Sequence, residues 1–329
     1  ESVFGPSPKA IAALQRASGE IWKYGDPTSL ELRWALARHY KVRPENIVVG
    51  EGIDGLLGYL ARMVIGPGDA VVTSDGAYPT FNYHVSGFGG VLHKVPYKQD
   101  SEDLPTLLQK AGRVGAKLVY FANPDNPMGT WLSGVFVMEC LAYLPKETLL
   151  ILDEAYIEFA PDGTAAQIAI EDPRVIRMRT FSKGYGLAGA RVGYALGAQD
   201  LIGQFEKIRN HFGMNRAAQS AAEAALSDQD WLSSVRHKVE ASKQEIARIA
   251  SENGLSTVES ATNFLAIDCG RDGAFAKAVL AHLLQAGLFV RMPSVAPQNR
   301  CIRVSAGRPE DMDLLSRALP KALAAASAS

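Results

Sequence analysis

The segment from Thr180 to Tyr194 contains the residues whose types and spacing could do covalent chemistry. Lys183 follows an apolar run, Val175 to Phe181, where a lysine can lose its charge and act as an amine nucleophile. Ser182, two glycine steps and Arg191, eight positions after the lysine, could cradle a phosphate. An amine beside an anion cradle indicates a cofactor with an aldehyde and a phosphate, which is pyridoxal phosphate. A Lys-Gly pair in a loop is usually a solvated surface lysine, so this interpretation needs support from elsewhere in the chain.

Asp153 ends a second apolar run, Leu149 to Leu152. A carboxylate in such a place is costly to bury unless it has a partner. That partner could be a protonated pyridine nitrogen or an arginine of the protein, and this segment does not decide between them. Tyr156 follows three residues later, close enough for its hydroxyl to reach an oxygen on the same pyridine ring.

The segment Gly52-Ile53-Asp54 opens a predicted helix, residues 52–64, directly after a predicted strand, Asn46–Gly50. A glycine-bearing helix N-terminus offers free backbone N–H groups to an anion, so these three residues are candidates to hold a phosphate. Many helices begin in this way, so this segment supports a phosphate site only in combination with the other segments.

Two further polar side chains follow predicted strands. Tyr78 comes after Ala70–Thr73 and before a proline, where it could pack in a turn or stack on a planar ring. Asn126 comes after Leu118–Ala122, in the segment Asn123–Gly129, whose proline steps fix an extended, turning backbone. By itself that segment predicts an Asx turn. Polar residues follow several separate strands, and it is improbable that all of them do so by chance. We therefore expect these residues to line one shared crevice.

Short apolar runs alternate with longer helical patterns through most of the chain. Several runs are apolar throughout, as expected for strands that are covered on both faces. This alternation of predicted strands and helices indicates an α/β domain with a mostly parallel sheet. Ligands of such a domain bind beyond the carboxyl ends of the strands. The predicted strands are Asn46–Gly50, Ala70–Thr73, Leu118–Ala122, Leu149–Leu152, Val175–Thr180 and Val192–Leu196.

The pattern changes from about Leu226 to that of a smaller α+β domain. Its predicted elements are a helix at Trp231–Asn253, a strand at Asn263–Asp268, a helix at Phe275–Ala286, and short strands near Leu288–Arg291 and Cys301–Ser305. We therefore expect three parts. Residues 23–225 form the large cofactor-binding domain and residues 226–329 the small domain. Residues 1–22 pack on the small domain or on a partner subunit.

The composition is that of an ordinary globular chain: 329 residues, 47% hydrophobic and 21% charged, with 34 Lys+Arg against 35 Asp+Glu. This charge balance argues against a nucleic-acid partner, and no apolar run is long enough to span a bilayer. Cys140, Cys269 and Cys301 are widely separated, which favours buried reduced thiols over a disulfide framework or a zinc site. We expect a cytoplasmic protein with no metal and no membrane partner.

The chain resembles the fold-type I pyridoxal phosphate enzymes of aminotransferase class I/II, and among them most closely the histidinol-phosphate aminotransferase family. The segment Asn123–Gly129 is similar to the family's Asn-Pro-Asn-Asn-Pro-Thr-Gly. The resemblance covers nearly the whole chain, and its other segments are Phe4–Lys9, Tyr24–Pro27, Asp153–Phe159, Thr180–Tyr194 and Ile302–Gly307. It implies a large α/β domain with a mostly parallel seven-stranded sheet between helices, plus a smaller α+β domain.

The resemblance also implies a role for each residue of the cofactor site. Lys183 would form the internal aldimine, and Asp153 would pair with the pyridinium nitrogen and keep the ring an electron sink. Tyr156 and Asn126 would hydrogen-bond the ring oxygen, and Tyr78 would stack on the ring face. The residues that would hold the phosphate are Gly52, Ile53, Asp54, Ser182 and Arg191.

Three more residues gain expected roles from the resemblance. Tyr24 would reach the phosphate of the neighbouring subunit's cofactor, so the active unit would be a homodimer with a shared site. Arg303 would hold the anionic group of the amino donor, as a bidentate fork suits a carboxylate. Arg291 is a second candidate for an anion contact. It could equally well be an arginine at the rim of the site that has no role in binding.

The implied activity is a ping-pong transfer of an amino group from a small-molecule donor to a 2-oxo acid. Histidinol phosphate with 2-oxoglutarate is the first expectation, and an aromatic amino acid is the next. A pyridoxal phosphate-dependent decarboxylase or lyase of the threonine-phosphate decarboxylase type is the main alternative. A ligand sensor fits less well, because the chain has no helix-turn-helix extension and no basic patch.

Overall fold

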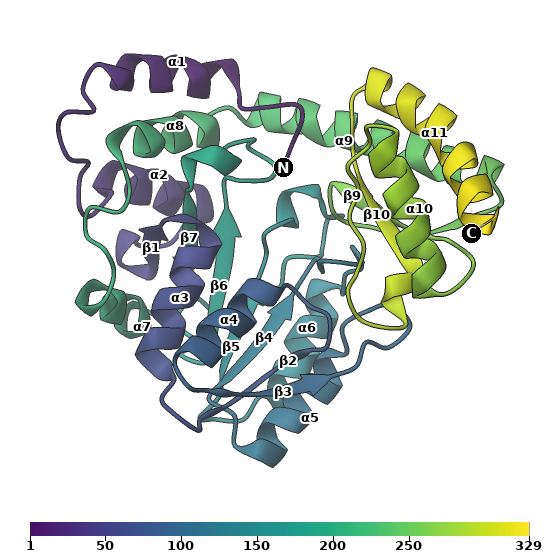
Figure 1. Cartoon of the computed structure of the whole chain (residues 1–329). Helices are drawn as coiled ribbons and strands as arrows, with labels where there is room; N and C mark the ends of the chain where they lie inside the picture. The colour runs from purple at the N-terminus through teal and green to yellow at the C-terminus, as the bar shows by residue number, and fades with distance from the viewer. Residues whose placement is uncertain (329) are drawn as a thin grey trace.

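A central sheet of mostly parallel strands lies between two layers of helices in the computed structural model, which describes residues 1–328 (Figure 1). Within those residues the sheet has seven strands in the order β1-β7-β6-β5-β4-β2-β3. Only β7 runs against its neighbours. The strands are β1 (Ile47–Gly50), β2 (Ala70–Ser74), β3 (Val91–Val95), β4 (Leu118–Ala122), β5 (Leu149–Asp153), β6 (Val175–Thr180) and β7 (Gly193–Leu196).

Both faces of this sheet are buried, which explains why its strands are apolar throughout. In β4, Leu118 and Tyr120 pack on one face with the helix residue Leu57, while Val119 and Phe121 pack on the other with Leu108. The period of two along a strand thus sends alternate side chains into separate cores. The helices on the large domain are α1 (Pro8–Ser18), α2 (Leu30–Tyr40), α3 (Gly52–Val64), α4 (Pro79–Gly87), α5 (Leu104–Val114), α6 (Gly134–Cys140), α7 (Gln199–Gln204) and α8 (Arg216–Leu226).

The C-terminal part of the chain forms a second core on one side of the large domain, drawn in green to yellow in Figure 1. Its antiparallel sheet has the order β10-β9-β8. Apolar residues of α10, α11 and the C-terminal half of α9 cover this sheet. The elements are α9 (Gln229–Glu252), β8 (Ser256–Val258), β9 (Phe264–Asp268), α10 (Gly273–Gln285), β10 (Cys301–Ser305) and α11 (Pro309–Ala328).

Short 3₁₀ turns link several of these elements. They are η1 (Pro44–Asn46), η2 (Leu141–Tyr143), η3 (Ile157–Phe159), η4 (Ala188–Ala190), η5 (Phe205–Lys207) and η6 (Gln298–Arg300). Two of them lie beside the predicted site: η3 directly follows Tyr156, and η4 directly precedes Arg191.

The predicted α/β class, with its mostly parallel sheet and a smaller α+β domain, is confirmed. The prediction was wrong at Leu288–Arg291, where the structure has only an isolated bridge between Arg291 and Arg303. Phe289 in that segment is 72% exposed, so the apolar residues that suggested a strand are not all covered. The strands β3 and β8 were not predicted, because both lie at sheet edges and all their residues except Val95 are exposed or half-buried.

The first residues of the chain contact both domains. Val3 accepts a hydrogen bond from Arg308 at 3.0 Å, and Phe4 packs beside Val235 and Val239 of α9. The helix α1 packs instead on α8, within the predicted large domain. The three-part division remains a prediction. Among residues 1–328, no helix is long and apolar enough to cross a membrane.

Candidate active site

A cavity of about 490 Å³ opens at the carboxyl ends of β4, β5 and β6, beside the start of α3. This is the place where an open parallel sheet binds its ligands. The structure brings most of the predicted site residues together here, although they come from segments more than a hundred positions apart. The predicted residues that line the cavity are Ile53, Asp54, Tyr78, Asn126, Asp153, Tyr156, Ser182, Lys183 and Arg191.

Lys183 is half-buried in this cavity and directly follows the end of β6 and Phe181-Ser182. Its Nζ lies 5.2 Å from the centre of the Tyr156 ring. Among the described residues this amine makes no hydrogen bond and no ion pair. It is therefore available to react with a ligand in the cavity.

Asp153 is buried at the end of β5, with 6% of its surface exposed. Its Oδ2 accepts a 2.6 Å hydrogen bond from the Tyr120 hydroxyl, and its Oδ1 accepts one of 2.9 Å from the backbone N–H of Ala155. Burial raises the pKa of Asp153, while the two hydrogen bonds and the charge of Lys183 oppose that rise. A cationic N–H donor in the cavity would stabilise the ionised carboxylate further.

A cradle for an anion forms where the start of α3 meets Arg191. Glu51, the N-cap residue of α3, makes no side-chain capping hydrogen bond, so the first N–H groups of the helix are free of such a partner. Gly52 has φ +79°, which L side chains rarely adopt, and a Cβ there would push the Arg191 guanidinium out of its place, so this position favours glycine. The Ser182 hydroxyl, which accepts a 2.9 Å hydrogen bond from Thr180, also lines the cavity.

Arg303 of β10 lies at the edge of the site and does not line the cavity itself. Its Nη1 donates a hydrogen bond to Asn126 Oδ1, and its guanidinium lies 4.6 Å from the centre of the Phe264 ring. Burial lowers the pKa of Arg303. Arg291 joins Arg303 through two backbone hydrogen bonds, of 3.1 and 2.6 Å, and also lies outside the cavity.

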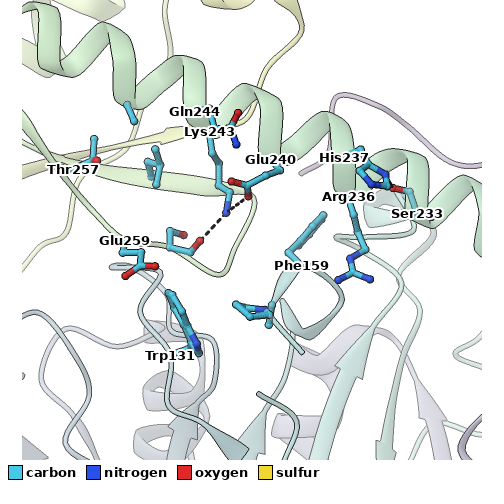
Figure 2. Close-up of a pocket in the computed structure, with 15 residues that line it drawn as sticks. Trp131, Phe159, Ser233, Arg236, His237, Glu240, Lys243, Gln244, Thr257 and Glu259 are labelled. Carbon is cyan, nitrogen blue, oxygen red and sulfur yellow. Dashed lines mark hydrogen bonds and ion pairs between the residues drawn. The ribbon is translucent and has the colours of Figure 1, made fainter. Parts of the chain in front are cut away.

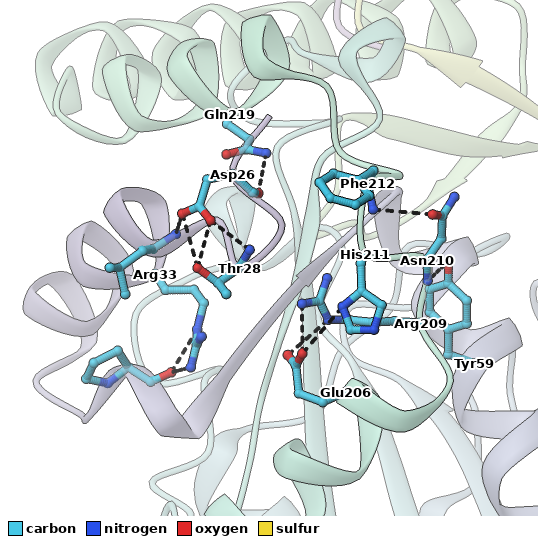
Figure 3. Close-up of polar contacts among 12 residues, drawn as sticks. Asp26, Thr28, Arg33, Tyr59, Glu206, Arg209, Asn210, His211, Phe212 and Gln219 are labelled. Carbon is cyan, nitrogen blue, oxygen red and sulfur yellow. Dashed lines mark hydrogen bonds and ion pairs between the residues drawn. The ribbon is translucent and has the colours of Figure 1, made fainter. Parts of the chain in front are cut away.

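Tyr24 does not line the cavity of its own chain. It is 77% exposed, and its ring packs on Phe212 with the centres 4.7 Å apart. Figure 3 shows how the loop after it is fixed: Gln219 donates to the backbone of Asp26, and the Asp26 carboxylate accepts from Thr28. The structure thus presents Tyr24 at the surface on an ordered loop.

The sequence did not predict Tyr120 and Thr180 as residues of the site. Tyr120 lies inside an apolar strand and looked like a core residue, but a buried hydroxyl needs a hydrogen-bond partner. That requirement is the signal that could have identified it. Thr180, the last residue of β6, binds the Ser182 side chain and its backbone N–H.

A second cavity, of about 710 Å³, lies between α9 and loops of the large domain (Figure 2). It also contains a lysine, Lys243, whose Nζ donates to the Ser260 carbonyl at 2.7 Å and pairs with Glu240 at 2.9 Å. Because this amine already has partners, the cavity lacks the free nucleophile that Lys183 supplies. Size alone does not identify the reactive site.

The smaller cavity fits the pyridoxal phosphate that the sequence predicts. The Lys183 amine can react with the aldehyde, and the Asp153 carboxylate can pair with a ring nitrogen that carries a proton. The cradle formed by α3 and Arg191 can hold the phosphate. The fit rests on a free amine, a buried carboxyl and an uncapped helix N-terminus that meet in one place. Such a set can bind an amine-reactive cofactor and move protons beside it.

Comparison with known proteins shows which family this chain is similar to. The family model described as aminotransferase class I and II matches residues 1–319. The chain is 35% identical over 315 residues to histidinol-phosphate aminotransferase 2 of Carboxydothermus hydrogenoformans, covering 94% of this chain and 85% of that protein.

Two solved structures show the same fold. One is histidinol-phosphate aminotransferase from Sinorhizobium meliloti in complex with pyridoxal-5'-phosphate, with a TM-score of 0.98 and 53% identity over 100% of this chain and 90% of that one. The other is a putative histidinol-phosphate aminotransferase from Erwinia carotovora atroseptica, with a TM-score of 0.90 and 25% identity over 98% and 93% of the two chains.

Proposed function

This chain belongs to the aminotransferase class I and II family, and we propose that it moves an amino group from histidinol phosphate to a 2-oxo acid such as 2-oxoglutarate. Its cofactor is pyridoxal phosphate. The observation that carries the proposal is the single cavity that holds the Lys183 amine, the Asp153 carboxyl and the Arg191 guanidinium. The amino donor is inferred from relatives that are named for histidinol phosphate.

When bound, pyridoxal phosphate supplies an aldehyde to which amines add and a ring that accepts electrons from the substrate carbon. Lys183 is the residue that would bond to the aldehyde. Once the amino donor has displaced it from the aldehyde, the freed amine of Lys183 would take the proton from the substrate carbon that carries the amino group and return it during the exchange. The absence of any competing hydrogen bond among the described residues leaves Lys183 Nζ free for this work.

Asp153 would hold a proton on the ring nitrogen. Tyr120 and the Ala155 amide already donate to both of its oxygens, so the carboxyl is fixed in orientation before the cofactor binds. Fixed dipoles of this kind cost no reorganisation during the reaction. The remaining ring contacts that we propose are Tyr78 on the ring face and Tyr156 with Asn126 at the ring oxygen.

The phosphate would lie against Arg191, Ser182 and the N-terminus of α3 at Gly52, Ile53 and Asp54. Arg303 would bind the anionic group of each substrate, since its Nε is enclosed and has no acceptor among residues 1–328. A buried donor without a partner is costly, so an anion that reaches it gains a strong hydrogen bond. Arg291 remains a candidate for a second anion contact.

We further propose that the active unit is a homodimer in which Tyr24 reaches the partner subunit's cofactor phosphate. Ile21, Trp22 and Tyr24 are 69%, 78% and 77% exposed, and Phe212, whose ring packs on Tyr24, is 52% exposed. Aromatic residues gathered on a surface in this way are typical of an interface. The buried, free thiols of Cys140, Cys269 and Cys301 support a reducing compartment, and we place the enzyme in the cytoplasm.

A spectral titration of the purified holoenzyme tests the substrate. Histidinol phosphate, glutamate and an aromatic amino acid are added separately, and the visible absorption of the cofactor is followed. Loss of the band with histidinol phosphate, and its return with 2-oxoglutarate, identifies both half-reactions. No bleaching by histidinol phosphate removes it as the donor. Release of carbon dioxide without use of an amino acceptor identifies a decarboxylase instead.

A further inference from the structure

Glu102 and Asp125 form a buried pair of acids beside the substrate arginine. They are 3% and 1% exposed, and their side chains hydrogen-bond to each other. Glu102 comes from the loop after β3, and Asp125 precedes Asn126 in the turn after β4. Two carboxylates in contact cannot both be ionised at low cost, so the pair retains a proton. Neither residue has a role in the proposed amino transfer.

The hydrogen bonds of Asp125 stabilise its ionised form. It accepts from the Tyr97 hydroxyl at 2.7 Å and from the Met128 backbone N–H at 3.0 Å. Burial raises the pKa of Asp125 to about 6, against the lowering effect of these two bonds and of the bond from Glu102. Asp125 is therefore mostly ionised at neutral pH but lies close to its titration range.

Glu102 is the member that keeps the proton. It accepts from the Ser74 hydroxyl at 2.6 Å and from the Ala122 backbone N–H at 3.2 Å. Burial and the neighbouring charge of Asp125 hold the pKa of Glu102 well above its usual range. At neutral pH, Glu102 is thus a neutral acid that donates to the Asp125 carboxylate.

The positive charge of Arg303, in β10, lowers the pKa of Asp125. The same guanidinium donates to Asn126, the next residue in the chain. Arg303 Nε has no acceptor in the described part of the chain. The half-buried Arg303 therefore has an internal counter-charge and also a free Nε donor for an external anion.

The other titratable groups around the pair do not change charge near neutral pH. Burial raises the pKa of both Tyr97 and Tyr120, so these hydroxyls stay neutral. Asp100, two residues before Glu102, pairs with Arg300 at 2.7 Å, and that hydrogen bond lowers the pKa of Asp100. Asp125 is the member of the group whose charge responds most readily to a new ion.

On the proposed function, an anionic group of the substrate binds at Arg303. A second negative charge beside Arg303 makes ionised Asp125 less favourable, because both anions depend on the same cation. We propose that the Glu102–Asp125 pair takes up a proton when an anion binds at Arg303. The pair thus adjusts the charge of the site, which suits an enzyme whose two substrates differ in charge.

The direction of the pH effect follows from linkage. Because the complex holds more protons than the free enzyme, anion affinity rises as the pH falls, by at most about tenfold per pH unit for one proton. The rise stops below about pH 6, where Asp125 is already protonated without ligand. Above the pKa of Asp125 in the complex, the pair no longer makes the affinity depend on pH.

Isothermal titration calorimetry of the holoenzyme with glutarate tests the inference. Glutarate is a dicarboxylate with no amino or keto group, so it binds without reacting. Heats measured at pH 7 in buffers of different ionisation enthalpy give the number of protons taken up. Because Lys183 and the cofactor can also exchange protons, the informative quantity is the difference between wild type and Asp125→Asn. Asparagine is the matched replacement, since the motif that this segment resembles has asparagine at this place.

We expect wild type to take up more protons than Asp125→Asn. Glu102→Gln should match wild type, because the amide donates to Asp125 as the protonated acid does. Equal uptake in wild type and Asp125→Asn overturns the inference, and so does loss of uptake in Glu102→Gln with Asp125 intact.

A measurement on wild type avoids dependence on the folding of any variant. Infrared difference spectra with carbon-13 glutarate should show a new protonated carboxyl band of the protein at pH 7, and its absence contradicts the inference. Failure of the proposed function is a separate result. It would appear as wild type that neither binds the cofactor at Lys183 nor transfers an amino group.

Discussion

Tyr120 donates a 2.6 Å hydrogen bond to Asp153 Oδ2, and both side chains are buried. The relationship follows from the register of β4 and β5, in which Ala122 is opposite Asp153 and Tyr120 is two residues before Ala122. Residues two apart share a face of the sheet, so the tyrosine ring lies beside the carboxyl. The sheet itself thus orients the acid that we assign to the cofactor ring.

Tyr120→Phe removes this hydrogen bond and keeps the ring. The ionised form of Asp153 loses a donor, so its pKa rises further in the direction that burial already drives it. We expect kcat/KM to fall by about tenfold or more, with its acidic limb moved to higher pH. Steady-state kinetics from pH 5 to 9 measure both effects.

Tyr194→Phe is the matched control for Tyr120→Phe. Tyr194 is equally buried, and its hydroxyl lies 2.6 Å from that of Tyr40, away from Asp153. This variant should lose stability without moving the acidic limb. If both variants shift the pH profile alike, Tyr120 does not act through Asp153.

Gly52→Ala should weaken cofactor binding. Its φ of +79° is strained for alanine, and the new Cβ collides with the Arg191 guanidinium. We expect the dissociation constant of pyridoxal phosphate to rise by about tenfold or more, measured by absorbance after dialysis. Gly55→Ala, one turn further along α3, meets only ordinary contacts with Glu51 and should bind the cofactor normally. Equal binding by both variants would argue against the anion cradle.

The sequence was sufficient to predict the residues at the strand ends. Asp153 and Lys183 stand out because each comes directly after an apolar run, and a charge in that place needs a chemical reason. The likeness to a known family supplied the expected role of Arg303. Its contact with Asn126 joins residues 177 positions apart and depends on how the small domain packs on the large one. Local patterns do not contain that information.

Two errors show where pattern reasoning stops. Tyr120 looked like a core aromatic, since the pattern records burial and does not record which hydroxyl needs a partner. Leu288–Arg291 looked like a strand because it is apolar, yet Phe289 is largely exposed and only Arg291 pairs with a neighbour. In both cases tertiary packing decided the outcome.

Lys183→Ala should abolish amino transfer and the visible absorption of the bound cofactor, because Lys183 is the only lysine that lines the cavity among the described residues. We expect kcat to fall by at least about 10⁴-fold. Lys243→Met is the control: Lys243 is also buried, but it pairs with Glu240 in the other cavity. That variant should keep the absorption band even if its melting temperature drops. Turnover that survives in Lys183→Ala would remove the lysine from the mechanism.

Glu158 should make the enzyme less stable at alkaline pH. Its Oε2 is enclosed without a partner among residues 1–328, and burial raises its pKa from 4.5 to about 7. Between those two values the folded state binds more protons than the unfolded state, so stability falls as the pH rises through this window and stays low above it. The loss is at most about 3 kcal/mol.

Glu158→Gln should therefore raise the melting temperature at pH 8 more than at pH 5. Glu154→Gln gives the opposite result, because Glu154 is paired with Arg177 and Arg179, whose charges hold its pKa below the usual value against the effect of burial. Removing that carboxylate leaves the buried Arg179 and the half-buried Arg177 without their partner and should destabilise the protein most above pH 5. Scanning calorimetry at both pH values separates the two variants. If the Glu158→Gln protein is instead less stable than wild type at pH 8, ionised Glu158 stabilises the folded state, and the prediction is wrong.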